Sequence, residues 1–375
     1  MDASLYIHIP FCARRCRYCA FASGPYNHAR VAAYLDALER EADARDDLAR
    51  LRERPPTTIF VGGGTPTSLA TEEMRQWLRV ATRWGRADEF TVEANPGTAT
   101  PEKLALLRSS GVNRLSVGVQ TFDTDGLRIL GRAHGPDEAA SALRLTADAG
   151  FPNRSADLIA GWPGQTEASL ADDIARVLGL GATHVSCYAL AVEPGTRLGR
   201  DVAGNRAPPP DEERLRRLDD RAAETLARAG FRRYEVSNYA PRGRECRHNV
   251  RAWEGGEYLG LGAAAHSHRD GRRYANVRST AAYVRRIMAG KAAEAFSERL
   301  SPARKARETA VTWLRLTDGI DAERFRALTG FSLDELYEVE LPGLLASGGL
   351  LWDGGRLRLG NGVLPVADAV LSELV

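Results

Sequence analysis

Short apolar runs alternate with amphipathic stretches through the first two thirds of the chain. Runs rich in β-branched and aromatic residues predict strands at 5–9, 58–61, 90–94, 114–119, 156–160 and 185–190. Apolar residues spaced three and four apart predict helices at 29–52, 71–84, 101–110, 123–130, 136–149 and 167–178. Because parallel strands need crossover connections, this alternation predicts an α/β fold with a parallel sheet. Functional residues should then gather at the carboxyl ends of the strands.

The pattern changes after the sixth predicted strand. Three prolines at 208–210 precede a charged segment, 211–229, that predicts one more helix, and glycines are frequent at 255–262. From about Thr280 helical periodicity dominates, followed by two short strands around Leu350 and Leu357. This order is typical of a small helical, winged-helix-like domain with a β-hairpin wing. We therefore predict a core at 1–235, a connecting segment at 236–279 and a C-terminal domain at 280–375.

Composition places the chain among ordinary globular proteins, with 375 residues of which 43% are hydrophobic and 27% charged. Its 51 Lys and Arg against 49 Asp and Glu leave a net charge of +2, which argues against nucleic acid as a partner. We find no pattern typical of a secretory signal and no apolar run of membrane-spanning length. We expect a cytoplasmic protein in a reducing compartment; peripheral membrane association with a client stays open.

Three cysteines follow the first predicted strand at short spacing: Cys12, Cys16 and Cys19. In a reducing compartment such clustering indicates metal ligation instead of disulfides. Thiolates suit both zinc and iron-sulfur clusters. A structural zinc site needs four ligands, whereas a [4Fe-4S] cluster on three cysteines leaves one iron free to bind a small molecule. The residues favour the cluster and leave zinc as the alternative.

The spacing Cys-x3-Cys-x2-Cys in a loop after the first strand resembles the radical S-adenosylmethionine superfamily. The resemblance implies a core that is an incomplete (β/α)6-type TIM barrel, followed by the smaller C-terminal domain. It also implies a [4Fe-4S] cluster on the three cysteines, with S-adenosylmethionine bound to the open iron. In such proteins an electron from the cluster cleaves this cofactor into methionine and a 5'-deoxyadenosyl radical.

Motifs at later strand ends are similar to those of the branch that contains oxygen-independent coproporphyrinogen III oxidase. One is a Gly-Gly-Gly-Thr-Pro-Thr segment at 62–67, where backbone N–H groups can approach a carboxylate closely. Carboxylates accept hydrogen bonds from ribose hydroxyls, and Gln and Arg bind polar edges. The residues that the resemblance assigns to S-adenosylmethionine are Tyr6, Tyr18, Phe21, Gly63, Gly64, Thr65, Pro66, Glu93, Gln120, Arg132, Asp157 and Ala191.

Within this branch the chain resembles the heme chaperone group called HemW more than the oxidase. The oxidase has a fourth cysteine where this chain has Phe21, and the early first strand leaves no room for the oxidase's N-terminal extension. Residues 248–253 resemble the group's His-Asn-x-x-Tyr-Trp segment, with Ala252 in place of the Tyr. The resemblance implies that His248 and Trp253 bind heme, with heme as cargo and a neutral imidazole as the iron ligand.

Three functions follow as alternatives. The first is a heme chaperone that delivers heme to a client hemoprotein of unknown identity; it needs an electron donor only if the cluster is reduced, and a homodimer is compatible with it. The second is a radical enzyme that decarboxylates coproporphyrinogen III or methylates another substrate, although oxidase activity is not expected. The third is a zinc-stabilised nucleic-acid-binding protein, which the near-neutral charge disfavours. We assign no catalytic residue.

Overall fold

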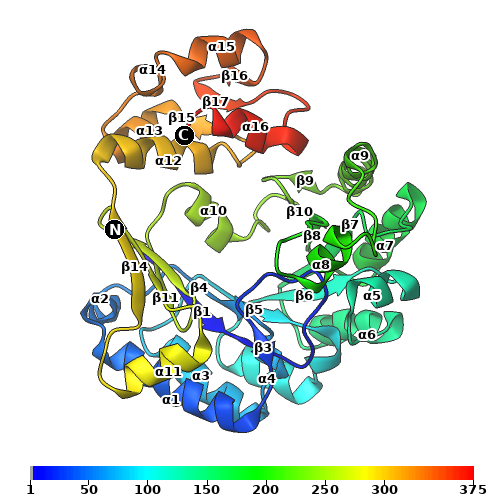
Figure 1. The fold of residues 1–375 in the computed structure, drawn as a ribbon, viewed down its shortest axis with the longest axis vertical. Coiled ribbons are helices and arrows are strands. Elements are labelled where there is room, and N and C mark those ends of the chain that lie inside the picture. Colours follow the sequence, from blue (N-terminus) through cyan, green and yellow to red (C-terminus); the bar gives the residue numbers. More distant parts are fainter. Residues whose placement is uncertain (1–2) are drawn as a thin grey trace.

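A large curved sheet dominates the computed structural model, which describes residues 3–375 (Figure 1). The described chain holds a 12-stranded sheet of order β14-β13-β12-β11-β1-β4-β5-β6-β7-β8-β10-β9. Neighbouring strands from β11 to β8 are parallel, which confirms the predicted α/β sheet. The bounds are β1 (Ser4–Ile9), β4 (Thr58–Gly63), β5 (Glu89–Ala94), β6 (Arg114–Gln120), β7 (Asn153–Ala160), β8 (His184–Ala189) and β11 (Tyr258–Leu261).

Antiparallel strands extend this sheet at both edges. The outermost strands, β14 and β9, do not pair with each other within residues 3–375, so the barrel is incomplete. The added strands are β9 (Arg232–Arg233), β10 (Asn238–Ala240), β12 (His266–Arg269), β13 (Arg272–Asn276) and β14 (Glu294–Arg299). Separately, β2 (Phe11–Cys12) pairs with β3 (Gly24–Pro25) at the base of the cysteine loop.

Amphipathic helices cover the outer face of the parallel strands (Figure 1). They bury apolar stripes against the sheet, for example Leu35 and Leu38 of the first helix and Trp77 of the next long one. Side-chain caps fix several starts, as where Thr100 accepts from the backbone N–H of Lys103. The bounds are α1 (His28–Ala44), α3 (Thr71–Thr82), α4 (Pro101–Ser109), α5 (Thr124–Leu130), α6 (Pro136–Asp148), α7 (Glu167–Gly179), α8 (Arg197–Ala203) and α9 (Glu212–Arg228).

The helix predicted at 29–52 is wrong in its second half. The helix α1 ends at Ala44, and Arg45 takes an extended conformation before α2 (Asp46–Ala49) and the 3-10 turn η1 (Arg50–Arg52). Leaving the helix allows the Arg45 guanidinium to donate to the Gly260 carbonyl at 2.5 Å and to the Asp47 carboxylate at 2.7 Å. A tertiary contact therefore overrides the helical periodicity.

A second unit follows the sheet and has its own hydrophobic core, which includes Trp313, Phe325 and Tyr337. Its predicted hairpin is present as β16 (Leu350–Asp353) and β17 (Arg356–Leu359), with the short β15 (Ile320–Asp321) pairing alongside. The helices of this unit are α12 (Pro302–Trp313), α13 (Ala322–Thr329), α14 (Leu333–Leu336), α15 (Glu340–Ala346) and α16 (Ala367–Ser372), with the 3-10 turn η4 (Leu364–Val366). Among the described elements these form the small C-terminal unit.

Residues 280–299, which the sequence pattern assigned to the C-terminal domain, pack with the sheet instead. The helix α11 (Thr280–Met288) buries Tyr283 in the core of the large unit. The strand β14 pairs with β13. The core of the second unit therefore begins later, with Ala306.

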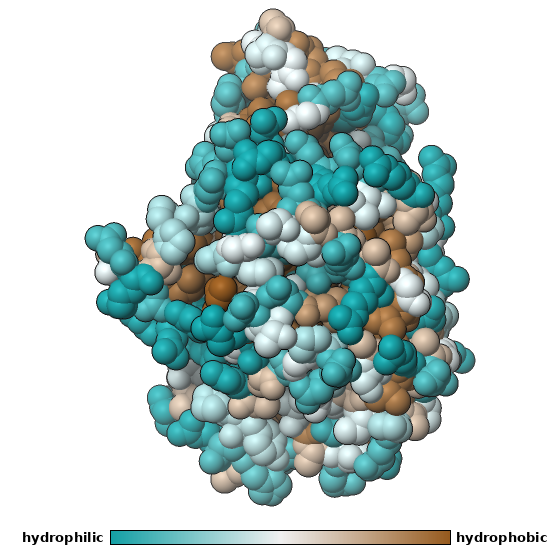
Figure 2. Space-filling view, turned by 90° about the vertical axis from the view of Figure 1, so that its right-hand side faces the viewer, coloured by the Kyte–Doolittle hydropathy of each residue, from teal (hydrophilic) through white to brown (hydrophobic). Residues whose placement is uncertain are grey.

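One short helix, α10 (Arg247–Trp253), lies between the sheet and the C-terminal unit (Figure 1). It contacts both β4 and α12. Figure 2 shows a face of the molecule that is mostly hydrophilic, with apolar residues in small scattered patches, as is normal for a protein surface.

Candidate cofactor site and histidine site

The carboxyl ends of β4 to β8 and the cysteine loop, residues 12–23, enclose a cavity of about 450 Å³. The structure thus brings together most of the side chains that the resemblance assigned to a cluster and S-adenosylmethionine. Those that line the cavity are Cys12, Cys16, Tyr18, Cys19, Phe21, Gly63, Gly64, Thr65, Glu93, Gln120, Arg132, Asp157 and Ala191.

Two residues of the predicted set are not among the cavity-lining residues. Tyr6 lies beneath the cavity, where its hydroxyl donates to Nδ1 of His8 at 2.9 Å and its ring lies 6.2 Å from that of Phe60. Pro66 is buried and begins the 3-10 turn η2 (Pro66–Ser68). Both support the cavity from below instead of facing it.

Contacts from distant parts of the chain hold the cysteine loop in place. Nε2 of His8 donates to the Ala22 carbonyl at 2.8 Å. The backbone N–H of Arg17 donates to the Leu130 carbonyl at 3.0 Å, and the Arg17 guanidinium pairs with Asp201 at 2.7 Å. Contacts with the rest of the fold therefore fix the position of the loop.

The three thiols are free, half-buried and surrounded by donors. Arg132 donates from Nη1 to Sγ of Cys16 at 3.1 Å, and Thr65 donates from Oγ1 to Sγ of Cys12 at 3.7 Å. Burial raises the pKa of Cys12 and of Cys19. Within residues 3–375 no three His, Cys, Asp or Glu side chains are gathered tightly enough for one metal ion. In a cubane each thiolate binds a different iron, so soft thiolates on one cavity wall fit a cluster better than zinc.

The glycine segment after β4 runs so close to its neighbours that side chains are excluded. A Cβ on Gly63 would lie 2.2 Å from the His8 ring, and its φ is +106°. A Cβ on Gly64 would lie 2.6 Å from the Phe11 carbonyl oxygen. The backbone N–H of Gly63 donates to Glu93 at 2.9 Å. These glycines let the backbone itself form one wall of the cavity.

Two carboxylates face the cavity from β5 and β7. Burial, with a contribution from nearby Asp157, raises the pKa of Glu93 to about 7. Burial also raises the pKa of Asp157, whose carboxylate accepts from the Ser116 hydroxyl at 2.9 Å. A hydroxyl-bearing or cationic ligand would satisfy these buried acceptors.

Arg132 and Gln120 complete the polar side of the cavity. Nη2 of Arg132 donates to Oδ1 of Asn95 at 2.6 Å and to the Gly118 carbonyl at 2.8 Å. Gln120 has a φ of +69°, unusual outside glycine, at the point where the register of β6 against β7 shifts. The bulge turns its backbone at the end of the strand, so a locally strained residue borders the site.

Sequence reasoning missed several lining residues, among them Asn95, Ser116 and Tyr188. Gly118 precedes Gln120 by two positions along β6 and Ser116 precedes it by four, so strand alternation would have placed all three on one face. Asn95 is the first residue after β5 and lies two positions beyond Glu93, so its place at a strand end was a usable signal. Tyr188 carries no comparable signal, because it depends on how β8 curves.

His248 lies at the opposite end of the sheet from the cysteines. Its Nδ1 is 2.9 Å from Oγ1 of Thr58, the first residue of β4, and its ring lies 5.2 Å from that of Phe60. The Thr58 hydroxyl donates to Ser4, so it accepts from Nδ1–H of His248. This tautomer leaves the lone pair on Nε2, for which the described residues provide no hydrogen bond. Burial and nearby Arg114 lower the pKa of His248 to about 4, so the ring is neutral at physiological pH.

A buried carboxylate positions the helix that carries this histidine. Glu89, the first residue of β5, accepts from the backbone N–H groups of Arg247 at 2.9 Å and of His248 at 3.0 Å. Sγ of Cys246 lies 3.5 Å from the same carboxylate and is fully buried. Cys246 is therefore occupied in the anchor of α10 and does not face a ligand.

Trp253 does not share the surroundings of His248. It packs against the core of the C-terminal unit, and the Arg315 guanidinium lies 5.6 Å from its ring. Ala252, where the family motif has Tyr, is exposed. The structure thus places the two predicted heme-binding residues on different sides of α10, and in this conformation they do not form one surface.

Comparisons with known proteins agree with this arrangement. Residues 6–177 match the Radical SAM superfamily, and residues 300–360 match the HemN C-terminal domain. The coproporphyrinogen III oxidase HemN from Escherichia coli, a radical SAM enzyme, has a similar fold, with a TM-score of 0.86, 22% sequence identity and coverage of 100% of this chain and 90% of that one. The incomplete barrel, the cysteine loop and these matches define a radical SAM protein.

Relatives of higher identity narrow the assignment. The chain is 36% identical over 349 residues to the heme chaperone HemW of Bacillus subtilis, with 92% of each chain covered. It is 35% identical over 382 residues to HemW of Mycobacterium tuberculosis, covering 99% of this chain and 94% of the relative. HemW of Escherichia coli is 37% identical over 271 residues, covering 70% and 69%. The chain belongs to the HemW family of heme chaperones.

In the part of the chain that the structure describes, no helix combines the length and the apolar character needed to cross a bilayer.

Proposed function

We propose that this chain binds heme through His248 and delivers it to a client hemoprotein. The observation that carries the proposal is the state of His248: Nδ1 is committed to Thr58, while Nε2 keeps its lone pair on a neutral ring. This is the state in which imidazole binds heme iron. The names of the relatives, heme chaperones, point to the same ligand.

The proposal gives Trp253 a smaller role than His248. Because Trp253 packs against the C-terminal unit, it contacts heme only if α10 changes its orientation. Ala252 removes the aromatic surface that the family motif has there, so iron coordination by His248 has to supply more of the affinity.

We propose further that Cys12, Cys16 and Cys19 hold a [4Fe-4S] cluster and that the cavity binds S-adenosylmethionine. When bound, the cluster supplies the electron that cleaves this cofactor into methionine and a 5'-deoxyadenosyl radical. The chain's own residues bind and orient: the Gly63 segment gives a backbone wall, and Glu93 and Asp157 accept from hydroxyl groups. The guanidinium of Arg132 offsets negative charge at Cys16.

A radical enzyme acting on a porphyrinogen is the second candidate. It is favoured by the cavity itself, because the same residues that bind S-adenosylmethionine could support its cleavage. Against it stands Phe21, which is 66% exposed at the cavity mouth where the oxidase has a fourth cysteine. The likeness to HemN extends to the fold and does not decide the activity.

All five cysteines are free, as in a reducing cytoplasm, which is where we place the protein. An electron donor is required only if the cluster is reduced.

Anaerobic reconstitution followed by heme titration tests the function. We expect about four irons and four sulfides per chain, and heme uptake without conversion of coproporphyrinogen. Cys16→Ser should abolish the cluster's visible absorbance and spare heme binding, because an alkoxide is a poor substitute for a soft thiolate. His248→Ala should shift or remove the heme spectrum and spare the cluster. Protoporphyrinogen formation would establish the enzyme instead, and a colourless zinc protein would exclude both.

A further inference from the structure

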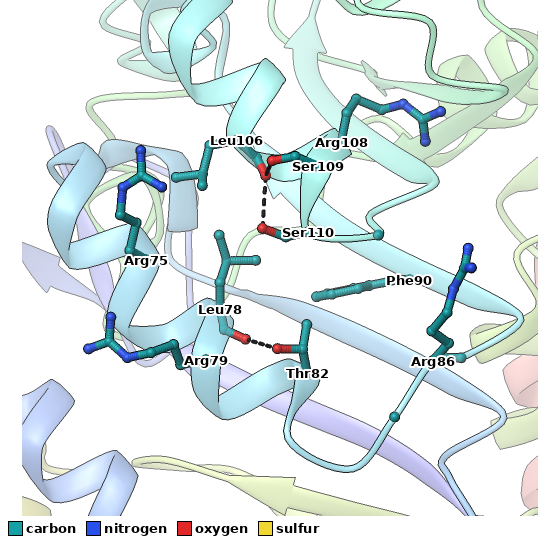
Figure 3. Close-up of a pocket in the computed structure, with 13 residues that line it drawn as sticks. Arg75, Leu78, Arg79, Thr82, Arg86, Phe90, Leu106, Arg108, Ser109 and Ser110 are labelled. Carbon is teal, nitrogen blue, oxygen red and sulfur yellow. Dashed lines mark hydrogen bonds between the residues drawn. The ribbon is translucent and has the colours of Figure 1, made fainter.

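A hollow of about 770 Å³ lies between α3, α4 and the loop that leads into β5. Four arginines surround it: Arg75, Arg79, Arg86 and Arg108. Figure 3 shows Arg75 and Arg79 of α3 on one side, Arg86 and Arg108 on the other, and the Phe90 ring between them. We call this region the basic hollow. Its floor is apolar, formed by Phe90 with Leu78 and Leu106.

The positive charge of the basic hollow is mostly uncompensated. Arg75 meets a single exposed carboxylate, Glu72, at 3.6 Å, and Arg108 donates to the Val112 carbonyl at 2.9 Å. Within residues 3–375, Arg79 and Arg86 have no ion-pair or side-chain hydrogen-bond partner. The whole chain balances 51 basic residues against 49 acidic ones, so this local excess is not a general property of its surface. The C-terminal ends of α3 and α4 border the hollow, and each offsets only about half of one positive charge.

The chemistry of the lining indicates what could fill the hollow. Its residues include no His, Cys, Met or Tyr that could bind heme iron. The hydroxyls of Thr82 and Ser110 already donate to the helix carbonyls of Leu78 and Leu106, so they do not form a phosphate cradle (Figure 3). What remains is a rim of guanidinium groups over an apolar floor. That combination suits carboxylates on either side of one apolar side chain.

The basic hollow lies beside the helix that carries His248. Asp88, which follows the hollow's loop, pairs with Arg247 at 3.2 Å, and the next residue, Glu89, holds the start of α10. Both features are at the amino ends of the parallel strands, away from the cysteine cavity. A protein seated on the hollow would therefore be next to α10.

We propose that the basic hollow is the docking surface for an acidic segment of the protein that exchanges heme with this chain. Carboxylates of that segment pair with Arg79 and Arg86, and one apolar side chain enters the hollow above its apolar floor. The identity of the partner, a protein that exchanges heme beside α10, rests on the proposed function. The binding chemistry rests only on the arginines and the floor.

A labelled peptide with four Glu on each side of one Phe tests the chemistry by fluorescence anisotropy. The variant R79E/R86E reverses the charge at the two arginines that have no partner. The matched control, R285E/R304E, changes the same charge at exposed positions, one again in the last turn of a helix and one in the C-terminal unit. Neither control residue has a side-chain partner among those described.

We expect R79E/R86E to weaken peptide binding at least tenfold and R285E/R304E to change it less than twofold. Raising salt from 50 to 300 mM should weaken binding to the unchanged chain at least fivefold, because exposed charges are screened. Equal losses in both variants, or no binding by the unchanged chain, would overturn the proposal. So would tripolyphosphate displacing the peptide at lower concentration than free peptide does, because the hollow would then be a phosphate site.

Heme titration of the same variants separates this inference from the proposed function. R79E/R86E should bind heme with the spectrum of the unchanged chain, since neither arginine contacts α10. If neither the unchanged chain nor any variant binds heme, the proposed function fails while the peptide result still stands. If heme binds but the peptide does not, only the docking surface is wrong.

Discussion

Glu93 faces the cofactor cavity with a carboxyl whose pKa burial raises to about 7. This carboxyl therefore changes its protonation state near physiological pH. The sulfonium group of S-adenosylmethionine is cationic and favours the ionised carboxylate. Below pH 7 the ligand must displace a proton from Glu93, which lowers its apparent affinity.

The first prediction follows from that linkage. S-adenosylmethionine should bind more tightly as the pH rises from 6 to 8, by up to about tenfold per pH unit below the pKa of Glu93. Glu93→Gln cannot ionise and should lose this part of the pH dependence. Isothermal titration of both chains at three pH values measures the difference, and the ligand's own titration cancels between them. Parallel pH profiles would show that Glu93 does not sense the ligand.

Gly63 allows a second prediction at the same scale. Gly63→Ala should lower the free energy of unfolding by about 2 kcal/mol or more and abolish S-adenosylmethionine binding, because its Cβ would lie 2.2 Å from the His8 ring at a φ of +106°. Gly150→Ala is the control, since Gly150 has a φ of +73° and nothing within 4 Å of the added Cβ. Similar losses in urea denaturation of both variants would assign the effect to strain and not to the close approach.

Most of the cavity-lining residues were predictable from the sequence because they lie in short motifs, with Glu93 near the end of β5 and Arg132 just after α5. Short runs rich in β-branched and aromatic residues also predicted the parallel strands that align those ends. The break at Arg45 was not predictable, since it depends on the Gly260 carbonyl, more than 200 residues away in the chain. Nor could the sequence show that His248 and Trp253 would face different units, because their relative placement depends on what α10 packs against.

The helix α10 carries the third prediction. Glu89→Ala should weaken heme binding at least tenfold and shift the heme spectrum, because two backbone N–H groups at the start of α10 would lose their buried acceptor. Glu89→Gln keeps one acceptor oxygen. Its heme affinity should therefore fall between those of the unchanged chain and Glu89→Ala. The cluster's absorbance should be the same in all three chains. An unchanged heme spectrum in Glu89→Ala would mean that α10 does not need this carboxylate to present His248.

At the scale of the whole molecule, two separate hydrophobic cores predict two unfolding transitions. Calorimetry should show a larger transition for the sheet and a smaller one for the unit that contains Trp313. S-adenosylmethionine with the cluster should raise the larger transition and leave the smaller one in place, because a ligand stabilises the part that binds it. A single transition that shifts as a whole would show that the two units unfold together.

The cysteine cavity and His248 lie at opposite ends of the sheet, which protects bound heme from the chemistry of the cavity. The strand β4 alone spans roughly 17 Å between them, and the interior along it is filled by Tyr6, Phe60 and their neighbours. A radical formed in the cavity would have no path through that packing to a porphyrin held at His248. The packed interior thus separates the two sites, so one chain can hold a reactive cofactor without exposing its heme cargo to damage.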